Sequence, residues 1–491
     1  MPTSPCDTGP EPHHDAGGEP FDLAVVGAGP AGLAATVEAA RLGLRVALLD
    51  AGDRPGGQYH RHPAPALGAL HPDALHHGWR AFARRTATLD GFVRSGRITY
   101  RPGCHVWTVV PGGPVWRLHA VGTADDTAVT VRARAVLLAT GSYERQLPFP
   151  GWTLPGIVAA GGAQAMLKSG LVLPGRRVVV AGSGPLLLAV AGSLATAGAR
   201  VPVVVEAGTY LGYAYFAPHV LRNPAKLAEG AAYGGTLLRR GVRVLTRHAV
   251  VEAHGTDRVE AVTVARLDAD WRPVPGTGRR IPCDAVAVGH GLVPQLELAT
   301  ALGCATRTSA DGTSALVLDT DQSTSVPGIW AAGEPGGIGG ARLAVLEGEL
   351  AAESVARSLL GARPPRVRNA RGPAAARRHR DRLRGFAEAM GAVHRPGAGW
   401  TDWLREDTEV CRCEEVPVAR VVEAVDTLGA RDARTVKLFT RAGMGWCQGR
   451  TCGSAVAALA GTPEAAPDRR PLSCPVPLRH LAELPEFPLS D

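Results

Sequence analysis

A glycine-rich turn between an apolar run and an Ala/Leu-rich segment constrains this chain more than any other feature. Residues 21–27 form a short strand-like run that leads into Gly27-x-Gly29-x-x-Gly32, and a second apolar run ends at Asp50. This spacing predicts a strand, a turn, a helix and a second strand, which is the start of a dinucleotide-binding fold. Gly27 allows the tight turn, Gly29 lets the backbone meet a pyrophosphate, and Gly32 lets the helix pack closely on the strand.

The same turn predicts how a dinucleotide is held. The helix would point its N-terminus, with its positive dipole end and free N–H groups, at the phosphates. The Asp50 carboxylate can accept a hydrogen bond from a ribose hydroxyl. We therefore predict that the cofactor is bound by Gly27, Gly29, Pro30, Ala31, Gly32 and Asp50.

Three later glycine-containing segments favour FAD over NAD at this first site. The first, Gly56-Gly57-Gln58, follows the second strand, where flavoenzymes pass glycines close to the cofactor. A strand-like run then ends in Ala139-Thr140-Gly141, and residues 326–334 repeat that pattern. We predict further cofactor contacts at Gly57, Gln58, Ala139, Thr140, Gly141, Gly333 and Glu334.

A second strand–turn–helix start lies further along the chain. Val178–Ala199 carries no charge and is long enough to cross a bilayer, but a Gly182-Ser-Gly184-Pro turn interrupts it, so we expect a buried strand, a turn and a helix. The third glycine position holds Leu187, which keeps helix and strand further apart. Glu206 ends the next strand and could accept a ribose hydroxyl. The segment either binds NAD through Gly182, Gly184 and Glu206, or keeps the fold without a working nucleotide site.

The rest of this second region carries no clear catalytic set. Ala285–Gly291 is another strand-to-glycine turn, which would lead back to the flavin region. We interpret His290 in that turn as a structural or cofactor contact rather than as an acid or a base. No cluster of His, Asp and Glu residues and no nucleophile motif stands out, so the catalytic residues stay unknown. The tyrosines of the region are interpreted as packing or interface residues: Tyr210, Tyr213, Tyr215 and Tyr233.

Four cysteines near the C-terminus form two close pairs, Cys411-x-Cys413 and, after 33 residues, Cys447-x4-Cys452. A [2Fe–2S] cluster needs four thiolates, two sulfurs for each iron. Structural zinc also takes four cysteines, but its usual C-x2–4-C spacing fits the first pair poorly. A disulfide framework is disfavoured by the odd total of nine cysteines and by the lack of an export signal. The cluster is therefore the favoured interpretation, with zinc as the alternative.

The length of 491 residues is enough for two or three domains. The net charge of +8 comes from residues 363–384, which hold nine arginines and one aspartate. This segment lacks interleaved aromatic residues, so we interpret it as a solvated helix or a docking face and expect no nucleic-acid binding. The absence of an export pattern and of a convincing membrane span favours the cytoplasm.

Taken together, these motifs resemble those of the flavoproteins with two dinucleotide-binding domains, the architecture of glutathione reductase. The resemblance implies an α/β fold with two such domains. In that family the late motif ends in Gly-Asp, and its carboxylate holds the flavin ribityl chain; here Glu334 is one methylene longer. The C-x4-C redox disulfide of the disulfide reductases is missing after Asp50, so thiol–disulfide chemistry is not expected.

Further motifs narrow the resemblance: Tyr143–Gly156, Gly161–Lys168, the Gly182 turn and the segment beginning at Cys411. They resemble the larger FAD subunits of opine oxidases, hydrogen cyanide synthase and related proline or hydroxyproline dehydrogenases, over nearly the whole chain. The C-terminal piece resembles the bacterioferritin-associated-ferredoxin-like [2Fe–2S] domain of that group. This resemblance implies a partner, an amino-acid-oxidase-like flavoprotein subunit that oxidises a small amine or amino-acid substrate, while the present chain passes electrons on.

The expected function is therefore an FAD- and [2Fe–2S]-dependent oxidoreductase, the electron-transfer subunit of a hetero-oligomeric amino-acid, imino-acid or opine dehydrogenase. One alternative is a stand-alone NAD(P)H-dependent reductase that passes electrons through the cluster. Another is a non-catalytic structural subunit of such a complex. Whether the inserted domain takes NAD(P), and whether a second flavin lies at a subunit interface, stay open.

The expected organisation has seven segments. They are a disordered tail (1–20), a FAD-binding domain in two parts (21–150 and 296–361), an inserted NAD-binding-like domain (151–295), a basic helical linker (362–404), the [2Fe–2S] domain with a small helical fold (405–462) and a C-terminal tail (463–491).

Overall fold

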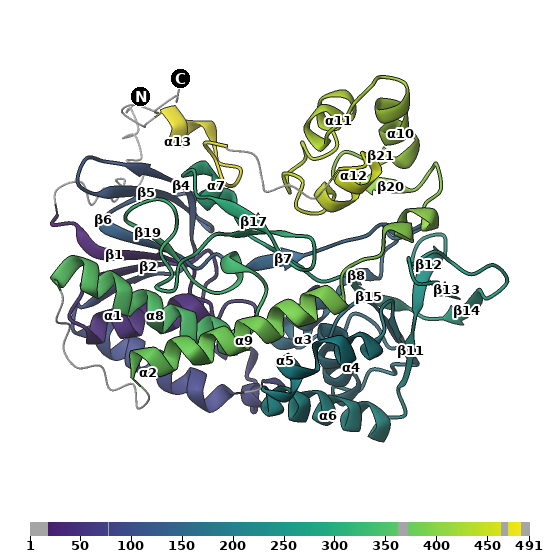
Figure 1. Ribbon diagram of the computed structural model, residues 1–491, viewed down its shortest axis with the longest axis horizontal. Coiled ribbons are helices and arrows are strands. Elements are labelled where there is room, and N and C mark those ends of the chain that lie inside the picture. Colours follow the sequence, from purple (N-terminus) through teal and green to yellow (C-terminus); the bar gives the residue numbers. More distant parts are fainter. Residues whose placement is uncertain (1–17, 77, 362–371, 463–469, 483–491) are drawn as a thin grey trace, which may run out of the picture.

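The computed structural model describes residues 18–76, 78–361, 372–462 and 470–482. Two dinucleotide-binding domains lie side by side, and a small domain of short helices lies at the top right of the view in Figure 1. A long helix, α9 (Pro373–Val393), runs diagonally across the two larger domains. The predicted α/β fold class, with two dinucleotide-binding domains and a small helical domain, is confirmed.

The first domain is built on a seven-stranded sheet in the order β3-β2-β1-β6-β5-β4, with β19 paired to the end of β6. The central strands are parallel and buried on both faces, as their continuous apolar sequences predict, whereas β4, β5 and the start of β6 form an antiparallel meander. The strands are β1 (Phe21–Val26), β2 (Val46–Leu49), β3 (Ile98–Arg101), β4 (Cys104–Pro111), β5 (Trp116–Gly122), β6 (Ala128–Leu138) and β19 (Ile329–Ala331). The helices are α1 (Pro30–Arg41), α2 (Trp79–Arg94), α7 (Glu297–Ala301) and α8 (Ala341–Leu360), with short 3-10 turns at Pro65–Leu67, Pro72–Leu75 and Glu334–Gly336.

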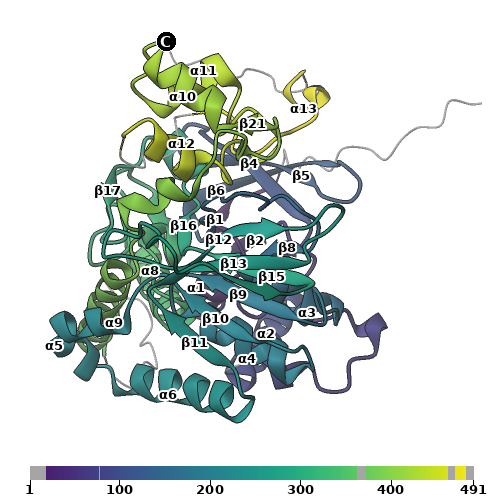
Figure 2. The ribbon, with the colours of Figure 1, turned by 90° about the vertical axis from the view of Figure 1, so that its right-hand side faces the viewer.

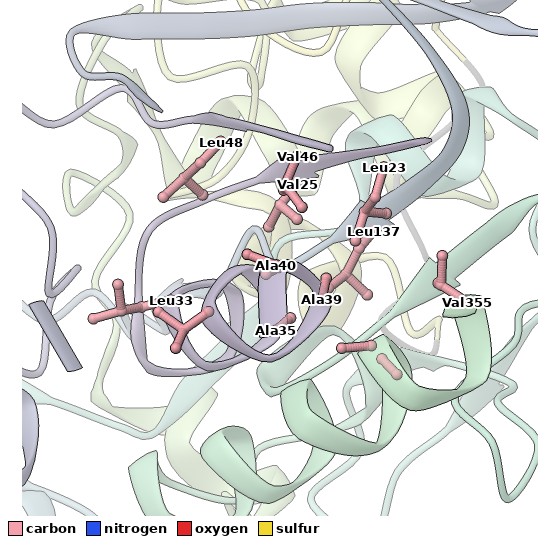
Figure 3. Packing of buried hydrophobic residues seen from close by; sticks show 14 of the residues in the cluster. Leu23, Val25, Leu33, Ala35, Ala39, Ala40, Val46, Leu48, Leu137 and Val355 are labelled. Atoms are coloured by element: carbon pink, nitrogen blue, oxygen red, sulfur yellow. The ribbon is translucent and has the colours of Figure 1, made fainter. Parts of the chain in front are cut away.

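Small side chains bring α1 and α8 close together against this sheet (Figure 3). Ala35 and Ala39 of α1 are fully buried, with Leu23 of β1 on the sheet side and Val355 of α8 on the other. A Cβ atom on Gly348 of α8 would lie only 2.2 Å from the Ala31 carbonyl oxygen, so the two backbones touch there. The helix that starts at the first glycine turn is thus held on both sides.

The inserted domain contains a five-stranded parallel sheet in the order β11-β10-β9-β15-β8 and a separate three-stranded antiparallel sheet. The uncharged stretch that begins at Val178 forms β9 and α4, which confirms the predicted strand, turn and helix. Two antiparallel strands, β7 (Ser142–Glu144) and β16 (Leu292–Pro294), form the joint with the first domain. The other strands are β8 (Ile157–Ala159), β9 (Val178–Gly182), β10 (Val203–Glu206), β11 (Arg243–Thr246), β12 (His248–His254), β13 (Ala261–Arg266), β14 (Arg279–Pro282) and β15 (Ala285–Gly289). The helices are α3 (Ala160–Gly170), α4 (Leu186–Thr196), α5 (Ala217–Leu221) and α6 (Pro224–Arg239), with a 3-10 turn at Tyr210–Phe216.

The small domain stands at one end of the molecule, where Figure 2 shows it at the top. Its hydrophobic core is continuous with that of the inserted domain. Trp403 stacks on Trp271 with ring centroids 6.2 Å apart and donates its indole N–H to the Trp271 carbonyl oxygen at 2.9 Å. Its elements are a 3-10 turn (Ala398–Trp403), β20 (Glu409–Cys411), β21 (Val416–Pro417), α10 (Val418–Asp426), α11 (Ala433–Thr440) and α12 (Gly453–Leu459).

The remaining described segments are a short hairpin and a C-terminal piece. The hairpin consists of β17 (Thr306–Thr308) and β18 (Ser314–Leu316). In the C-terminal piece, Cys474 packs against Trp107 of the first domain, followed by α13 (Leu478–Ala482). Residues 1–17, 362–371, 463–469 and 483–491, which include most of the two predicted tails and the start of the predicted linker, lie outside the described residues. Of the helices described, none is both long and apolar enough to span a bilayer.

Candidate functional site

The first glycine turn has the geometry that the sequence predicts. Gly27 has a φ of +104°, and a Cβ there would lie 2.4 Å from the Ala139 carbonyl oxygen. A Cβ on Gly32 would lie 1.8 Å from the Gly27 carbonyl oxygen. Both positions therefore need glycine, because real Cβ contacts are not that short. The turn brings Gly27, Gly32 and Ala139 together, although the two motifs are far apart in sequence.

The acidic residue at the end of β2 is tied to this turn. The Asp50 carboxylate accepts hydrogen bonds from the N–H groups of Ala28 and of Gly52, the second at 2.6 Å. Burial raises the pKa of Asp50, although these N–H groups oppose the rise. The side chain remains partly exposed, so the carboxylate can still meet a ribose hydroxyl. A Cβ on Gly57 would lie 2.8 Å from the Gly29 Cα atom, which places the second glycine loop directly against the first.

The start of α1 offers backbone donors suited to a pyrophosphate. Pro30 occupies the first turn, and no described side chain caps this helix end. In a first helical turn the N–H groups have no intrahelical acceptor, so those of Ala31 and Gly32 are available. Free N–H groups at a helix N-terminus, close-packed glycines and a nearby acid are what the ADP part of FAD requires. The residues present therefore fit this cofactor.

The predicted contacts of the later motifs lie beside the same turn but are engaged within the protein. The Thr140 hydroxyl donates to the Gln295 carbonyl oxygen at 2.7 Å, next to Gly141. The exposed Gln58 side chain accepts from Arg61 at 2.7 Å. The Glu334 carboxylate accepts from the N–H groups of Gly339 and Gly340 at 2.7 and 3.1 Å. The ribityl contact of Glu334 and the cofactor contact of Gln58 stay predictions.

Sequence reasoning missed a buried ion pair beside Gly333. Glu347 is 1% exposed, accepts from the Gly333 N–H at 3.1 Å and pairs with Arg384 of α9 at 2.6 Å. Arg384 also donates to the Gly337 carbonyl oxygen at 2.5 Å. The late glycine loop is therefore held by α9. No local signal marked this role, because Arg384 is one of nine arginines in a basic run.

The second glycine turn is covered by His394, the residue that follows the C-terminal end of α9. Ser183 donates its hydroxyl hydrogen to the His394 carbonyl oxygen at 3.2 Å, and the His394 Nδ1 atom lies 3.5 Å from the Glu206 carboxylate. Glu206 is fully buried, and its carboxylate accepts from the N–H groups of Gly184 at 3.0 Å and Gly208 at 2.9 Å. Tyr213 hydrogen-bonds the other ring nitrogen of His394 at 3.1 Å.

Few backbone donors of this second turn remain for a phosphate. The N–H of Ser183 donates to the Gly289 carbonyl oxygen, and Pro185 has no N–H. The N–H groups of Leu187 and Leu188 bond back to the preceding turn at 3.1 and 3.2 Å. Glu206, the acid that a ribose would need, is fully buried, whereas Asp50 of the first turn is partly exposed. These contacts favour the second of the two interpretations, a dinucleotide fold without a working nucleotide site.

His290 is buried in the joint between the two dinucleotide-binding domains. Its ring lies 5.9 Å from that of Trp403 and 6.4 Å from that of Trp271. Complete burial, aided by the charge of Arg145, lowers the pKa of His290 to about 3. The imidazole is therefore neutral at physiological pH, which agrees with the interpretation of His290 as a contact residue.

The four C-terminal cysteines come together in two pairs that the sequence spacing does not reveal. Cys411 contacts Cys452, and Cys413 contacts Cys447, so each pair joins one residue of each motif. The thiol of Cys452 and the N–H groups of Gly443, Glu414 and Cys413 lower the pKa of Cys411 to about 5. All cysteines in the described ranges are free thiols.

This arrangement fits two iron atoms, each held by one pair of sulfurs. A Cβ on Gly445 would lie 2.2 Å from the Cys413 Cβ, so glycine is needed for the loop to pass the ligand. Within the described part of the chain, no group of three or more His, Cys, Asp and Glu side chains is arranged to hold a single metal ion. The pairing of the thiols agrees with a [2Fe–2S] cluster, in which each iron takes two sulfurs.

The ligand loop is also fixed to the first domain. Arg450, between Cys447 and Cys452, pairs with Glu297 of α7 at 2.6 Å and donates to the Ser473 carbonyl oxygen at 2.7 Å. The side chains of Arg450 and Glu297 are 20% and 9% exposed, so solvent weakens this pair only partly. The small domain is thus attached to both larger domains.

Family models match the two parts of the chain that contain these candidate sites. The pyridine nucleotide-disulphide oxidoreductase family model matches residues 21–348, and the BFD-like [2Fe-2S] binding domain model matches residues 409–460. The chain is 36% identical over 441 residues to the HcnB subunit of hydrogen cyanide synthase from Pseudomonas aeruginosa, covering 87% of this chain and 90% of that protein. It is 34% identical over 444 residues to an opine oxidase subunit from Agrobacterium tumefaciens, covering 89% and 84%.

Solved structures support the fold. L-proline dehydrogenase from P. horikoshii matches with a TM-score of 0.63 and 20% identity, covering 95% of this chain and 80% of that chain. Thioredoxin reductase from T. acidophilum matches with a TM-score of 0.51 and 22% identity, covering 70% and 100%. The family resemblance expected from the motifs is confirmed, and so are FAD and a [2Fe–2S] cluster as cofactors. The chain belongs to the pyridine nucleotide-disulphide oxidoreductase family and is an FAD-dependent oxidoreductase with a BFD-like [2Fe–2S] domain, related to hydrogen cyanide synthase and opine oxidase subunits.

Proposed function

We propose that this chain is the electron-transfer subunit of a hetero-oligomeric dehydrogenase. A partner subunit of amino-acid-oxidase type would oxidise a C–N bond of an amino acid, imino acid or opine, and this chain would pass the electrons on. The names of the relatives support the proposal, since each is a subunit of hydrogen cyanide synthase or opine oxidase. A second flavin at the subunit contact stays part of this proposal.

The observation that carries the proposal is the covered second nucleotide site. A reductase that works alone would take hydride from NAD(P)H bound at the inserted domain. Here the acid that should hold the ribose, Glu206, is fully buried, and His394 lies 3.5 Å from its carboxylate. The electrons are therefore better supplied by a partner than by a nicotinamide.

The chain's own residues have three tasks in this scheme. The first glycine turn and Asp50 bind and orient the FAD. The pairs Cys411–Cys452 and Cys413–Cys447 hold the cluster. The α9 helix holds the two dinucleotide-binding domains in one arrangement, through Arg384 near its middle and His394 just after its C-terminal end. When bound, FAD supplies the conversion between two-electron and one-electron transfer, which a cluster cannot perform.

The test is an anaerobic visible spectrum of the chain alone, recorded after NADH, then NADPH, then dithionite. We expect the flavin and cluster bands to ignore both nicotinamides and to bleach with dithionite. Adding the partner subunit with its amine substrate should bleach the same bands. Rapid bleaching by NADH or NADPH without a partner would overturn the proposal and favour the stand-alone reductase. Bands that resist dithionite would instead favour a structural subunit.

A further inference from the structure

An ion pair joins the loop that carries two of the cluster cysteines to the first domain. Arg450 lies in sequence between Cys447 and Cys452. Its Nε atom is 2.6 Å from the carboxylate of Glu297 in α7. Glu297 is buried, and within the described ranges no other Lys, Arg or His pairs with it. A buried carboxylate without a partner is costly, so this pair holds the loop at one place on the first domain.

The acid of this pair is fixed relative to the turn at residues 139–141, for which we predict flavin contacts. The Thr140 hydroxyl donates to the Gln295 carbonyl oxygen at 2.7 Å, and the Gln295 N–H donates back to the same turn at 3.0 Å. Glu297 follows Gln295 by two residues. Leu296 between them is buried in the hydrophobic core of the first domain. A displacement of Glu297 is therefore resisted by both the core and the turn.

The C-terminal segment, residues 470–482, gives Arg450 a second contact. The Arg450 guanidinium donates to the Ser473 carbonyl oxygen at 2.7 Å. The Ser473 N–H in turn donates to the Trp107 carbonyl oxygen of β4 at 2.8 Å, and the buried Cys474 packs on the Trp107 side chain. In both views the small domain, β4 and α13 lie at the same end of the molecule (Figure 1 and Figure 2). Arg450 is thus held between α7 and a segment that is bonded to β4.

Other contacts of the small domain lead to the inserted domain instead. Trp403 stacks on Trp271, and Arg405 pairs with Glu252 of β12 at 2.7 Å. These contacts lie outside the loop that carries Cys447 and Cys452. Loss of the Arg450 pair should therefore release the ligand loop from the first domain while the small domain stays attached to the inserted domain.

We propose that Arg450 and Glu297 are positioning residues that fix the cluster at a set distance and orientation from the flavin. This proposal rests on the proposed electron-transfer function and adds the contact that positions the two redox sites within the chain. In the transfer that it serves, one electron leaves reduced FAD and is gained by the oxidised cluster. The pair only holds the two sites, because neither side chain is itself redox-active.

The test follows electron transfer between the two cofactors in the FAD- and cluster-loaded chain, without a partner. A light pulse on a deazaflavin with a sacrificial donor supplies single electrons. Visible absorbance then follows their movement from FAD to the cluster. Pulsed EPR on partly reduced protein measures the separation of the two paramagnetic centres. We expect fast transfer and one narrow separation in the wild-type protein.

Neutral variants of the pair should disturb both readouts. Glu297→Gln and Arg450→Gln should each slow the transfer about tenfold or more, because a shift of about 1 Å can slow a positioned reaction up to about 100-fold. The separation measured by EPR should become broader. The double variant should lose no more than either single variant, because the two side chains form one contact. Arg450→Lys keeps a charge opposite Glu297 and should recover part of the rate.

The matched control is Arg405→Gln, which breaks a pair between the small domain and the inserted domain. It should leave the transfer rate and the EPR separation unchanged. Equal slowing in Arg405→Gln would overturn the proposal, since any loosening of the small domain would then suffice. If Arg450→Gln loses its cluster bands, Glu297→Gln decides alone, because its change lies outside the small domain.

The outcomes separate this proposal from the proposed function. Wild-type rate and separation in Glu297→Gln and Arg450→Gln would overturn the positioning role and leave the electron-transfer function standing. Absence of any transfer from FAD to the cluster in the wild-type protein would overturn the proposed function together with this inference. The electrons come from a photochemical donor, so the result is independent of their natural source.

Discussion

Replacing Gly32 by alanine should disrupt the FAD site through one steric contact. The added Cβ would lie 1.8 Å from the Gly27 carbonyl oxygen and 3.2 Å from the Ala139 Cβ. To restore an ordinary contact, α1 must move away from β1 by more than about 1 Å, because backbone atoms cannot rotate aside. Such a movement is opposed by α8, whose Gly348 already touches the Ala31 backbone.

The magnitude follows from the cost of overpacking. Extra carbon atoms in a packed core cost about 1–3 kcal/mol, and the upper end applies here because backbone is met on one side and a packed helix on the other. At about 2–4 °C per kcal/mol, the flavin domain should unfold about 6–12 °C lower. The same displacement moves the α1 N-terminus away from the pyrophosphate, so FAD content after purification should fall as well.

The measurement is thermal unfolding followed by flavin fluorescence, together with the FAD released per chain. The matched control is Gly234→Ala on α6, where an added Cβ meets no atom within 4 Å. That change should be neutral or stabilise by roughly 0.5–1 kcal/mol, because glycine is a poor residue in a helix interior. Wild-type FAD content and wild-type melting in Gly32→Ala would refute the close-packing argument and the assignment of this turn to the cofactor.

Three further predictions follow from the cluster site, the α9 helix and the domain joint. Cys413→Ser should abolish the visible bands of the cluster while FAD stays bound. The control Cys304→Ser, which alters a buried cysteine far from the site in sequence, should keep these bands. Unchanged bands in Cys413→Ser would exclude Cys413 as a cluster ligand. Arg384→Ala leaves the buried Glu347 carboxylate unpaired and should lower the free energy of unfolding, measured with urea, by about 3 kcal/mol. The control Arg420→Ala breaks an exposed pair with Glu423 and should lower it by less than about 1 kcal/mol. Equal losses in the two variants would contradict the role of α9 as a support. Burial lowers the pKa of His290 to about 3 from its ordinary 6.5, so the unfolded chain binds this proton first and stability should fall as pH drops from about 6.5 toward 3. Between pH 6.5 and 5 this loss is about 2 kcal/mol, and His290→Gln should remove it; an identical pH dependence in the variant would show that other groups cause the acid sensitivity.

Local motifs predicted the parts of this protein that depend on short stretches of chain. The first glycine turn could be assigned to a dinucleotide because a strand, three glycines, a helix and an acid follow each other within residues 21–50. The uncharged stretch from Val178 could be divided correctly because Gly182 and Pro185 interrupt it. The four cysteine positions could be grouped as one candidate site because four thiolates in two close pairs match the ligand set of a [2Fe–2S] cluster.

Long-range contacts decided what the second dinucleotide fold can do. The glycine turn at Gly182 and the acid Glu206 indicate an NAD site, except that Leu187 occupies the third glycine position. The structure covers that site with His394, 211 residues from Ser183 in sequence. The same helix carries Arg384, which in sequence is one more charge in a basic run but pairs with a buried acid. No local pattern encodes either contact, since both depend on where a distant helix packs.

The sequence by itself therefore determined the fold class and marked the FAD turn and the four thiols as candidate sites, because glycine sterics and thiolate chemistry act within a few residues. Tertiary structure alone decided that Cys411 pairs with Cys452 and Cys413 with Cys447, and that one pair is buried while the other is exposed. It also decided that α9 covers the second nucleotide site. The physical reason is the same in each case: burial, charge pairing and exposure depend on the packing of segments that are distant in sequence.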